Sequence, residues 1–194
     1  MIRSKTINLF WFLLMASVSP ILFWSHLSAG TSTGTTRLRE NKLAGLRPGQ
    51  DTIENAYKLF KRDPDQQLDL RQSSWFDVCI GQRTTVAFNS SNVIQSVAIE
   101  NKLVAPVVDC NDKADSHFAR AKFGSSHGLL RHDSCERITD IYGTPDSKTG
   151  ADSNRTVYLY SYQKTAQGPA LTWEITCDTG VNQVYSLNLA VSAK

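Results

Sequence analysis

Residues 124–128 (GSSHG) match the G-x-S-x-G pattern that surrounds the nucleophilic serine of many hydrolases. In that pattern the serine, here Ser126, stands on a sharp turn between a strand and a helix, and an acid and then a histidine follow it along the chain. The histidines after Ser126 are His127 and His132, and neither follows an acid in that order. The stretch is therefore interpreted as a glycine-rich connection, with a small secreted hydrolase as the alternative.

A second group of residues could bind a metal ion. Outside the first thirty residues the histidines are His117, His127 and His132, and Cys135 follows closely. Zinc is held by such side chains, but structural sites bring their ligands in closely spaced pairs, which are missing here. A buried or disulfide-bonded Cys135 is the simpler interpretation, so no metal or other cofactor is expected. A metal-dependent enzyme is kept as part of the alternative.

The first thirty residues have the features of a secretory signal peptide. Arg3 and Lys5 precede an apolar stretch over 7–24, and small residues at Ser28 and Gly30 predict cleavage before Thr31. The alternative is an uncleaved membrane anchor, because the apolar stretch approaches the length of a membrane span. The expected location is secreted or periplasmic, with membrane contact only if cleavage fails.

The charge of the remaining chain argues against nucleic acid as a partner. Two of the 21 basic residues and none of the 18 acidic residues lie in the first thirty, which leaves 19 basic and 18 acidic groups. Nucleic-acid binding needs a concentrated basic patch. The basic character of the whole chain is thus no evidence for it.

The hydrophobic pattern predicts two similar units. Residues 51–62 and 133–144 each have helical periodicity, and Asp51 with Glu54 suggests a capping box at the first helix. Each helix is followed by three strand-like runs, which are 73–80, 83–89 and 92–100 and then 155–162, 170–177 and 182–190. The predicted fold class is α+β, with two tandem repeats of a helix plus an antiparallel meander whose sheets could join into one surface.

The corresponding domain organisation has five segments. These are a signal peptide (1–30), a flexible lead (31–44), repeat 1 (45–100), a linker (101–127) and repeat 2 (128–194).

A Gly-Leu lead, a capped helix ending at Tyr142-Gly143-x-Pro145 and a three-strand meander resemble one unit of the small-protein-A/outer-membrane-lipoprotein-A family. In tandem they resemble the β-lactamase-inhibitory-protein architecture. The resemblance covers about 45–100 and 128–190. It implies a non-enzymatic protein of the cell envelope or secretome, inhibitor-like in that it binds another, unidentified protein. Fold analogy alone does not establish function.

The predicted binding surface is the sheet face opposite the helices. Aligning the units at an offset of 82 places Phe76 beside Tyr158 on the helix side, and side chains alternate along a strand, so Trp75 and Asp77 are expected to point outward. On the other strands this outward face is predicted to include Thr172, Glu174, Thr176, Ser186 and Asn188. No catalytic residue is predicted.

Four cysteines remain after removal of the first thirty residues, and an even number in an exported chain indicates two disulfides. Cys135 takes an inward helix position, and Cys177 shares a strand face with apolar residues. Two inward positions of one unit can approach closely enough to bond. The predicted pairs are Cys135–Cys177 and, by elimination, Cys79–Cys110.

Overall fold

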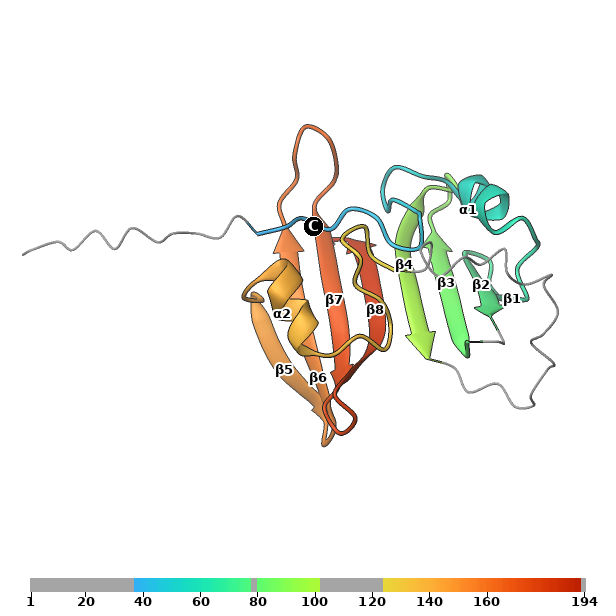
Figure 1. The fold of residues 1–194 in the computed structure, drawn as a ribbon. Coiled ribbons are helices and arrows are strands. Elements are labelled where there is room, and N and C mark those ends of the chain that lie inside the picture. Colours follow the sequence, from blue (N-terminus) through green and yellow to red (C-terminus); the bar gives the residue numbers. More distant parts are fainter. Residues whose placement is uncertain (1–36, 78–79, 102–123, 193–194) are drawn as a thin grey trace, which may run out of the picture. The chain divides into compact units, whose positions relative to one another are not determined.

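The eight strands found among the described residues form one antiparallel sheet in the order β1-β2-β3-β4-β8-β7-β6-β5. The structure, a computed structural model, describes residues 37–77, 80–101 and 124–192, which all belong to one compact unit, Gly34–Lys194. In chain order the elements are α1 (Ile53–Phe60), β1 (Gln66–Asp69), β2 (Gln72–Asp77), β3 (Gln82–Phe88), β4 (Ile94–Asn101), α2 (Glu136–Tyr142), β5 (Ser147–Asp152), β6 (Arg155–Tyr162), β7 (Leu171–Asp178) and β8 (Gln183–Val191). Figure 1 shows these elements along the sheet.

The predicted α+β class with two tandem repeats is wrong, because the fold is mainly β. A single eight-stranded sheet carries most of the regular structure, and the two helices are short. Pairing of β4 with β8 joins the strands of both halves into one sheet. That pairing satisfies backbone groups which two separate meanders would leave exposed at their edges.

Two strands were not predicted from the sequence. β1 and β5 are the outer strands of the sheet, and every one of their residues is exposed. Their sequences, QQLD and SKTGAD, have no alternation of apolar and polar residues that could mark them. Both have a register shift, and short polar edges with irregular pairing discourage unwanted strand addition.

The two helices lie where the periodicity predicted them, but their caps differ. α1 begins after Thr52, and Asn55 completes the capping box, one residue later than the predicted Asp51–Glu54 pair. α2 follows Cys135, and no side chain caps its first turn. Asp133 instead accepts a hydrogen bond from the backbone nitrogen of Leu130 at 2.8 Å.

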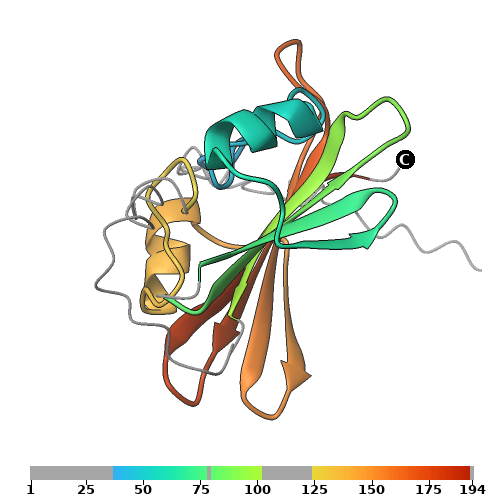
Figure 2. The ribbon, with the colours of Figure 1, turned by 90° about the vertical axis from the view of Figure 1, so that its right-hand side faces the viewer.

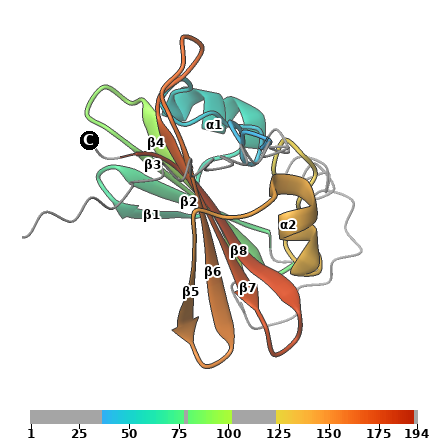
Figure 3. The same ribbon diagram turned by 90° about the vertical axis from the view of Figure 1, so that its left-hand side faces the viewer.

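The helices cover one face of the sheet, as Figures 2 and 3 show from two sides. Continuous pairing carries one row of side chains across six strands on this face, and all its members are buried: Trp75, Thr84, Ile99, Leu187, Ile175 and Tyr158. A parallel row beside it is equally buried: Ser73, Val86, Val97, Leu189, Trp173 and Tyr160. The predicted burial of Tyr158, Tyr160 and Tyr162 beneath the helices is confirmed.

An N-terminal strap, residues 37–46, runs across the helix side of the sheet (Figure 1). Arg37 forms an ion pair with Asp146 at 2.8 Å, and Arg39 donates to the backbone oxygens of Gln163 and Pro169. Further along, Leu43 and Leu46 are buried in the core. Residues 37–44 belong to the segment expected to be a flexible lead, yet these contacts hold them in place.

Candidate functional site

Four of the six predicted binding residues lie together on the face that the helices do not cover, called here the helix-free face. Glu174 on β7 is paired directly with Asn188 on β8, and Ser186 is paired with Thr176. Thr172 lies further along β7 on the same face. All are half-buried, so each keeps part of its surface available to a partner.

The helix-free face mixes polar and apolar side chains, since Glu174 is paired with Leu159 and Thr176 with Val157, and its charges are partly neutralised. Arg83 and Glu100 form an ion pair on neighbouring strands, and Glu100 is paired in register with Ser186. Ser74 and Thr85 share a hydrogen bond of 2.9 Å and are buried between their neighbours. Because side chains near Glu174 and Asn188 are small or uncharged, this part of the face combines hydrogen-bonding groups with little charge.

The prediction that Trp75 points away from the helices is wrong. Its side chain is 1% exposed, and its ring centroid lies 4.7 Å from that of Phe60 and 5.9 Å from that of Tyr57, both on α1. Its Nε1 donates to the backbone oxygen of Arg62 at 3.2 Å. Trp75, rather than Phe76, occupies the same row as Tyr158. The alignment was one residue out, and a one-residue slip moves every side chain of a strand to the other face.

Asp77 ends β2 and shares the side of Trp75, so it too is not on the helix-free face. Its Oδ1 accepts a hydrogen bond from the backbone nitrogen of Ile80 at 3.3 Å. Phe76, predicted to face the helices, is instead paired with Arg83 on the helix-free face. Val78 lies outside the described residues.

One predicted disulfide is confirmed. Cys135 and Cys177 are bonded, with their Cα atoms 5.8 Å apart, which is within the usual range. The bond joins the start of α2 to β7, and both residues are buried. Disulfides persist in oxidising compartments and are rare in the cytosol. Cys79 and Cys110, the other predicted pair, lie outside the described residues.

A buried carboxylate, Glu40, was not predicted from the sequence. It is 0% exposed, and its Oε1 accepts hydrogen bonds from three backbone nitrogens, those of Asn41, Lys42 and Ser126. The hydroxyl of Ser126 also donates to Oε1, and the hydroxyl of Tyr142 donates to Oε2 at 2.7 Å. Five donors thus offset the loss of hydration that a buried carboxylate suffers.

The number of hydroxyl protons at Tyr142 and its neighbours determines the direction of these hydrogen bonds. A phenol has one proton, and an ionised carboxylate can only accept, so the Tyr142 hydroxyl donates to Glu40. The Ser125 hydroxyl, 2.7 Å from the Tyr142 oxygen, must therefore donate to Tyr142. Ser125 Oγ also accepts hydrogen bonds from the backbone nitrogens of His127 and Leu129. Burial, with the neighbouring charge of Glu40, raises the pKa of Tyr142 far above its ordinary value.

Ser126 therefore meets an acid, Glu40, that lies upstream in the chain, but no histidine among the described residues is bonded to it. The Nε2 atom of His127 lies 3.0 Å from the backbone oxygen of Arg39, a hydrogen bond in which the ring must be the donor. The arrangement ties residues 124–129 to the N-terminal strap. It has the character of a structural hydrogen-bond cluster.

The residues considered for metal binding are engaged elsewhere. The sulfur of Cys135 is in the disulfide, and His132 Nδ1 lies 3.3 Å from Oε1 of Gln183. Within 37–77, 80–101 and 124–192, no three His, Cys, Asp or Glu side chains are grouped to hold a metal ion. His117 is outside those ranges.

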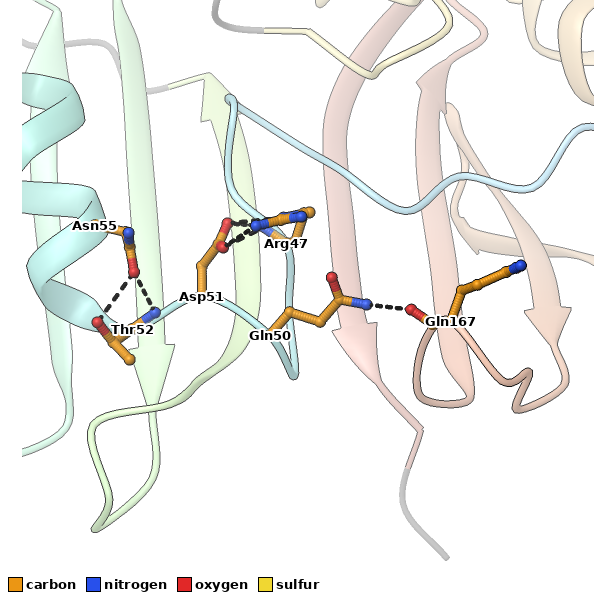
Figure 4. Close-up of polar contacts among 6 residues, drawn as sticks. All are labelled: Arg47, Gln50, Asp51, Thr52, Asn55 and Gln167. Atoms are coloured by element: carbon orange, nitrogen blue, oxygen red, sulfur yellow. Dashed lines mark hydrogen bonds and ion pairs between the residues drawn. The ribbon is translucent and has the colours of Figure 1, made fainter.

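A groove of about 560 Å³ lies beside α1. Its lining comes from the N-terminal strap, the turn before the helix and the helix itself: Lys42, Gly45, Leu46, Arg47, Asp51, Asn55, Lys58 and Leu59. Figure 4 shows the polar side of this region, where the Arg47 guanidinium binds the Asp51 carboxylate through two nitrogens, the closer contact being 2.8 Å. The hydrogen bonds and charge of Asp51 raise the pKa of Arg47.

The turn before α1 is also tied to the second half of the sheet. Nε2 of Gln50 donates to the backbone oxygen of Gln167 at 2.7 Å (Figure 4). Gln167 lies in the β6–β7 loop, and Arg39 holds both ends of this loop through the backbone oxygens of Gln163 and Pro169. No sequence pattern marked this groove, because its residues come from polar and irregular segments.

Among the described residues, the helices are too short and too polar to cross a membrane.

The sequence matches no protein-family model and no curated protein. The solved structures that match this chain include two proteins, both with TM-scores below 0.5. One is a DUF4309 family protein from Bacillus subtilis, with a TM-score of 0.46 and 11% identity over 80% of this chain and 88% of the other. The second is a cysteine-rich secretory protein from Staphylococcus aureus, with a TM-score of 0.46 and 12% identity over 80% of this chain. The match spans 48% of that protein, so this chain corresponds to about half of its length.

Proposed function

We propose that this protein is exported and acts without catalysis, by binding another protein through the helix-free face of its sheet. The observation that carries the proposal is the contrast between the two faces. One face is buried beneath the helices, whereas on the other Glu174, Asn188, Ser186 and Thr172 lie together and partly exposed. Antiparallel sheets commonly use one face for the core and leave the second to solvent.

The composition of this face suits a protein partner. Protein interfaces that form and separate are about as polar as the rest of the surface, with roughly one hydrogen bond for each 100–200 Å². Paired side chains such as Glu174 and Asn188 offer acceptors and donors at fixed positions on adjacent strands. A rigid sheet presents them with little loss of side-chain entropy on binding, because their backbone is already ordered.

Two features support export. The apolar stretch over 7–24, followed by Ser28 and Gly30, has the order of charged, apolar and small residues found in signal peptides. The Cys135–Cys177 disulfide requires an oxidising compartment to persist. The periplasm and the extracellular medium both meet this requirement. The sequence resemblance to inhibitory proteins of the envelope and secretome is in keeping with a binding role.

The decisive experiment is site-specific photo-cross-linking in the native host. A photoreactive amino acid replaces Asn188 on the helix-free face or, as a control, Gln67 on the exposed edge strand β1. We expect the protein substituted at 188 to cross-link to a discrete partner protein, and the protein substituted at 67 not to. The additional substitution Glu174→Arg should abolish the cross-link without lowering the melting temperature, because Glu174 is half-exposed.

Equal cross-linking from both positions, or none from 188, would overturn the proposal. A further variant separates binding from the hydrolase or metal-enzyme alternative. Replacing His117, His127 and His132 together removes the histidines outside the first thirty residues. The cross-link from 188 should survive this change if the protein works by binding.

A further inference from the structure

We infer that the groove beside α1 is a second contact site for the partner and that it takes an acidic segment of that protein. The inference rests on the proposed binding function and adds the chemistry of the segment bound. It is carried by the charge on the rim of the groove, the exposed part of Leu59 and the amide of Asn55. Each of these comes from described residues that line the groove.

The rim has an excess of positive charge. Lys42, Arg47 and Lys58 line the groove with a single acid, Asp51. Asp51 accepts hydrogen bonds from both the backbone and the guanidinium of Arg47, so these two charges offset each other. Lys42 and Lys58 are exposed, and no ion pair within 4.0 Å joins either to a described carboxylate. The charge of Lys58 also acts on Glu54, one turn earlier on α1, so it is partly offset. The groove lining still carries a net positive charge that attracts carboxylates.

The apolar part of the groove lining comes from leucines. Leu46 is 2% exposed, and Leu59 is half-buried against the core. Gly45 has φ +80°, and a Cβ there would come within 2.9 Å of Cδ2 of Leu59, so glycine lets the backbone lie close against that side chain. A peptide can place an apolar side chain against the exposed part of Leu59 and its carboxylates on the rim.

Asn55 adds a donor suited to a peptide backbone. Its Oδ1 accepts hydrogen bonds from the nitrogen and the hydroxyl of Thr52, which orients the amide (Figure 4). The Nδ2 group points away from Thr52 and can donate to a carbonyl oxygen. The groove volume of 560 Å³ lies within the range of about 300–1,000 Å³ usual for binding sites. The occupant of this site is thus a short segment that alternates acidic and apolar residues.

The test uses a labelled six-residue peptide of alternating glutamate and leucine, with a glutamine–leucine peptide as its neutral match. Fluorescence anisotropy measures binding to the full chain at physiological ionic strength. Lys42→Glu/Lys58→Glu should weaken binding of the acidic peptide at least about tenfold, because attraction becomes repulsion between like charges. Lys148→Glu/Lys164→Glu, which makes the same charge change at other exposed positions, should alter Kd by less than about twofold because of screening.

Three results would overturn the inference. They are equal weakening by both variant pairs, equal binding of the glutamine peptide, and displacement of the acidic peptide by inorganic phosphate or by vesicles of anionic lipid at similar concentrations. The cross-link from position 188 separates this inference from the proposed function. If that cross-link persists while the groove fails these tests, the partner binds the helix-free face alone.

Discussion

The two halves of the sheet hold their helices by different means. α1 is held by Trp75, whose ring lies against Phe60 and Tyr57 of the helix. α2 is held by the Cys135–Cys177 bond and by Tyr142. The ring of Tyr142 contacts Tyr160 and Trp173, and its hydroxyl donates a hydrogen bond to Glu40. One helix is thus attached mainly through apolar packing around Trp75, and the other through a covalent bond and a buried hydrogen-bond cluster.

The difference shows how a short helix can be kept on a sheet. Seven or eight residues are too few to form a stable helix alone, so tertiary contacts must supply most of the stability. In the first half that stability comes from apolar burial and a capping box. In the second half the helix lacks a side-chain cap. The disulfide at Cys135, where this helix begins, fixes its start instead.

The largest effect is expected from Trp75→Ala. Removing a buried tryptophan loses apolar burial and leaves a cavity, and the free energy of unfolding should fall by roughly 3–5 kcal/mol. Chemical denaturation of the variant measures this loss. Substitution of the neighbouring exposed residue Leu70 by alanine is the control and should change stability by less than about 0.5 kcal/mol. Wild-type stability in Trp75→Ala would show that α1 is held by other contacts.

Loss of the disulfide should rank next. Cys135→Ala/Cys177→Ala removes a bond that closes a loop with a sequence separation of 42, and the expected loss is about 2–4 kcal/mol. Calorimetry of the double variant gives the change in melting temperature. If the variant has the melting temperature of the wild type, Tyr142 and its hydrogen bonds are enough to hold α2. The two helices are then held in more similar ways than described above.

Alkaline pH should weaken the second half in particular. Burial raises the pKa of Tyr162 to about 12 from an ordinary value of 10, and it also raises the pKa values of Tyr142 and Tyr160. The folded protein therefore favours the neutral phenols. Their contribution to stability is complete below pH 10 and is lost as pH rises from about 10 toward 12.

Urea unfolding at pH 8 and pH 11 measures this change, which should be roughly 1 kcal/mol for each buried tyrosine at pH 11. Tyr162→Phe removes one ionisable phenol and should reduce the difference between the two pH values by about that amount. Tyr57, which is 37% exposed on α1, serves as the matched position. If Tyr57→Phe reduced the difference in stability between pH 8 and pH 11 as much as Tyr162→Phe does, the alkaline effect would not be specific to the second half of the sheet.

The smallest effect is expected from the cap of α1. Asn55→Ala removes the acceptor for the nitrogen and hydroxyl of Thr52, and stability should fall by about 1 kcal/mol. Asn55→Asp keeps a carboxyl oxygen in place and should restore most of the loss. Thermal unfolding resolves a change of this size. An unaltered melting temperature in Asn55→Ala would mean that other contacts, such as the hydrogen bond from the backbone nitrogen of Ile53 to the backbone oxygen of Asn92, fix the start of the helix.

Much of the fold followed from periodicity, and the errors have definite causes. The alternation of Tyr158, Tyr160 and Tyr162 identified a buried face, because polar residues or smaller ones separate them. In the stretch Trp75–Phe76 apolar residues point to both sides, so alternation could not say which was inside. The helix-free positions Glu174 and Asn188 were found because their strands alternate cleanly between apolar and polar residues.

The parts that sequence reasoning missed depend on distant contacts. Glu40 lies in a polar stretch without periodicity, and its partners Ser126 and Tyr142 are 86 and 102 residues away. Nothing local marks such a residue as buried. The same holds for the groove beside α1, whose walls come from the strap, a turn and a helix. The edge strands β1 and β5 were missed because all their residues are exposed, so their side chains need no alternation of apolar and polar types.

The position of β8 has a consequence for the timing of folding. β8 is the last strand of the chain, yet it lies in the middle of the sheet between β4 and β7. While the chain is being made, β4 therefore has an unpaired edge until the C-terminal residues have emerged. Folding that depends on such distant pairings is slow, since the chain must close long loops first. In a fold of this kind the sheet is completed only once β8 has been made and has paired with β4.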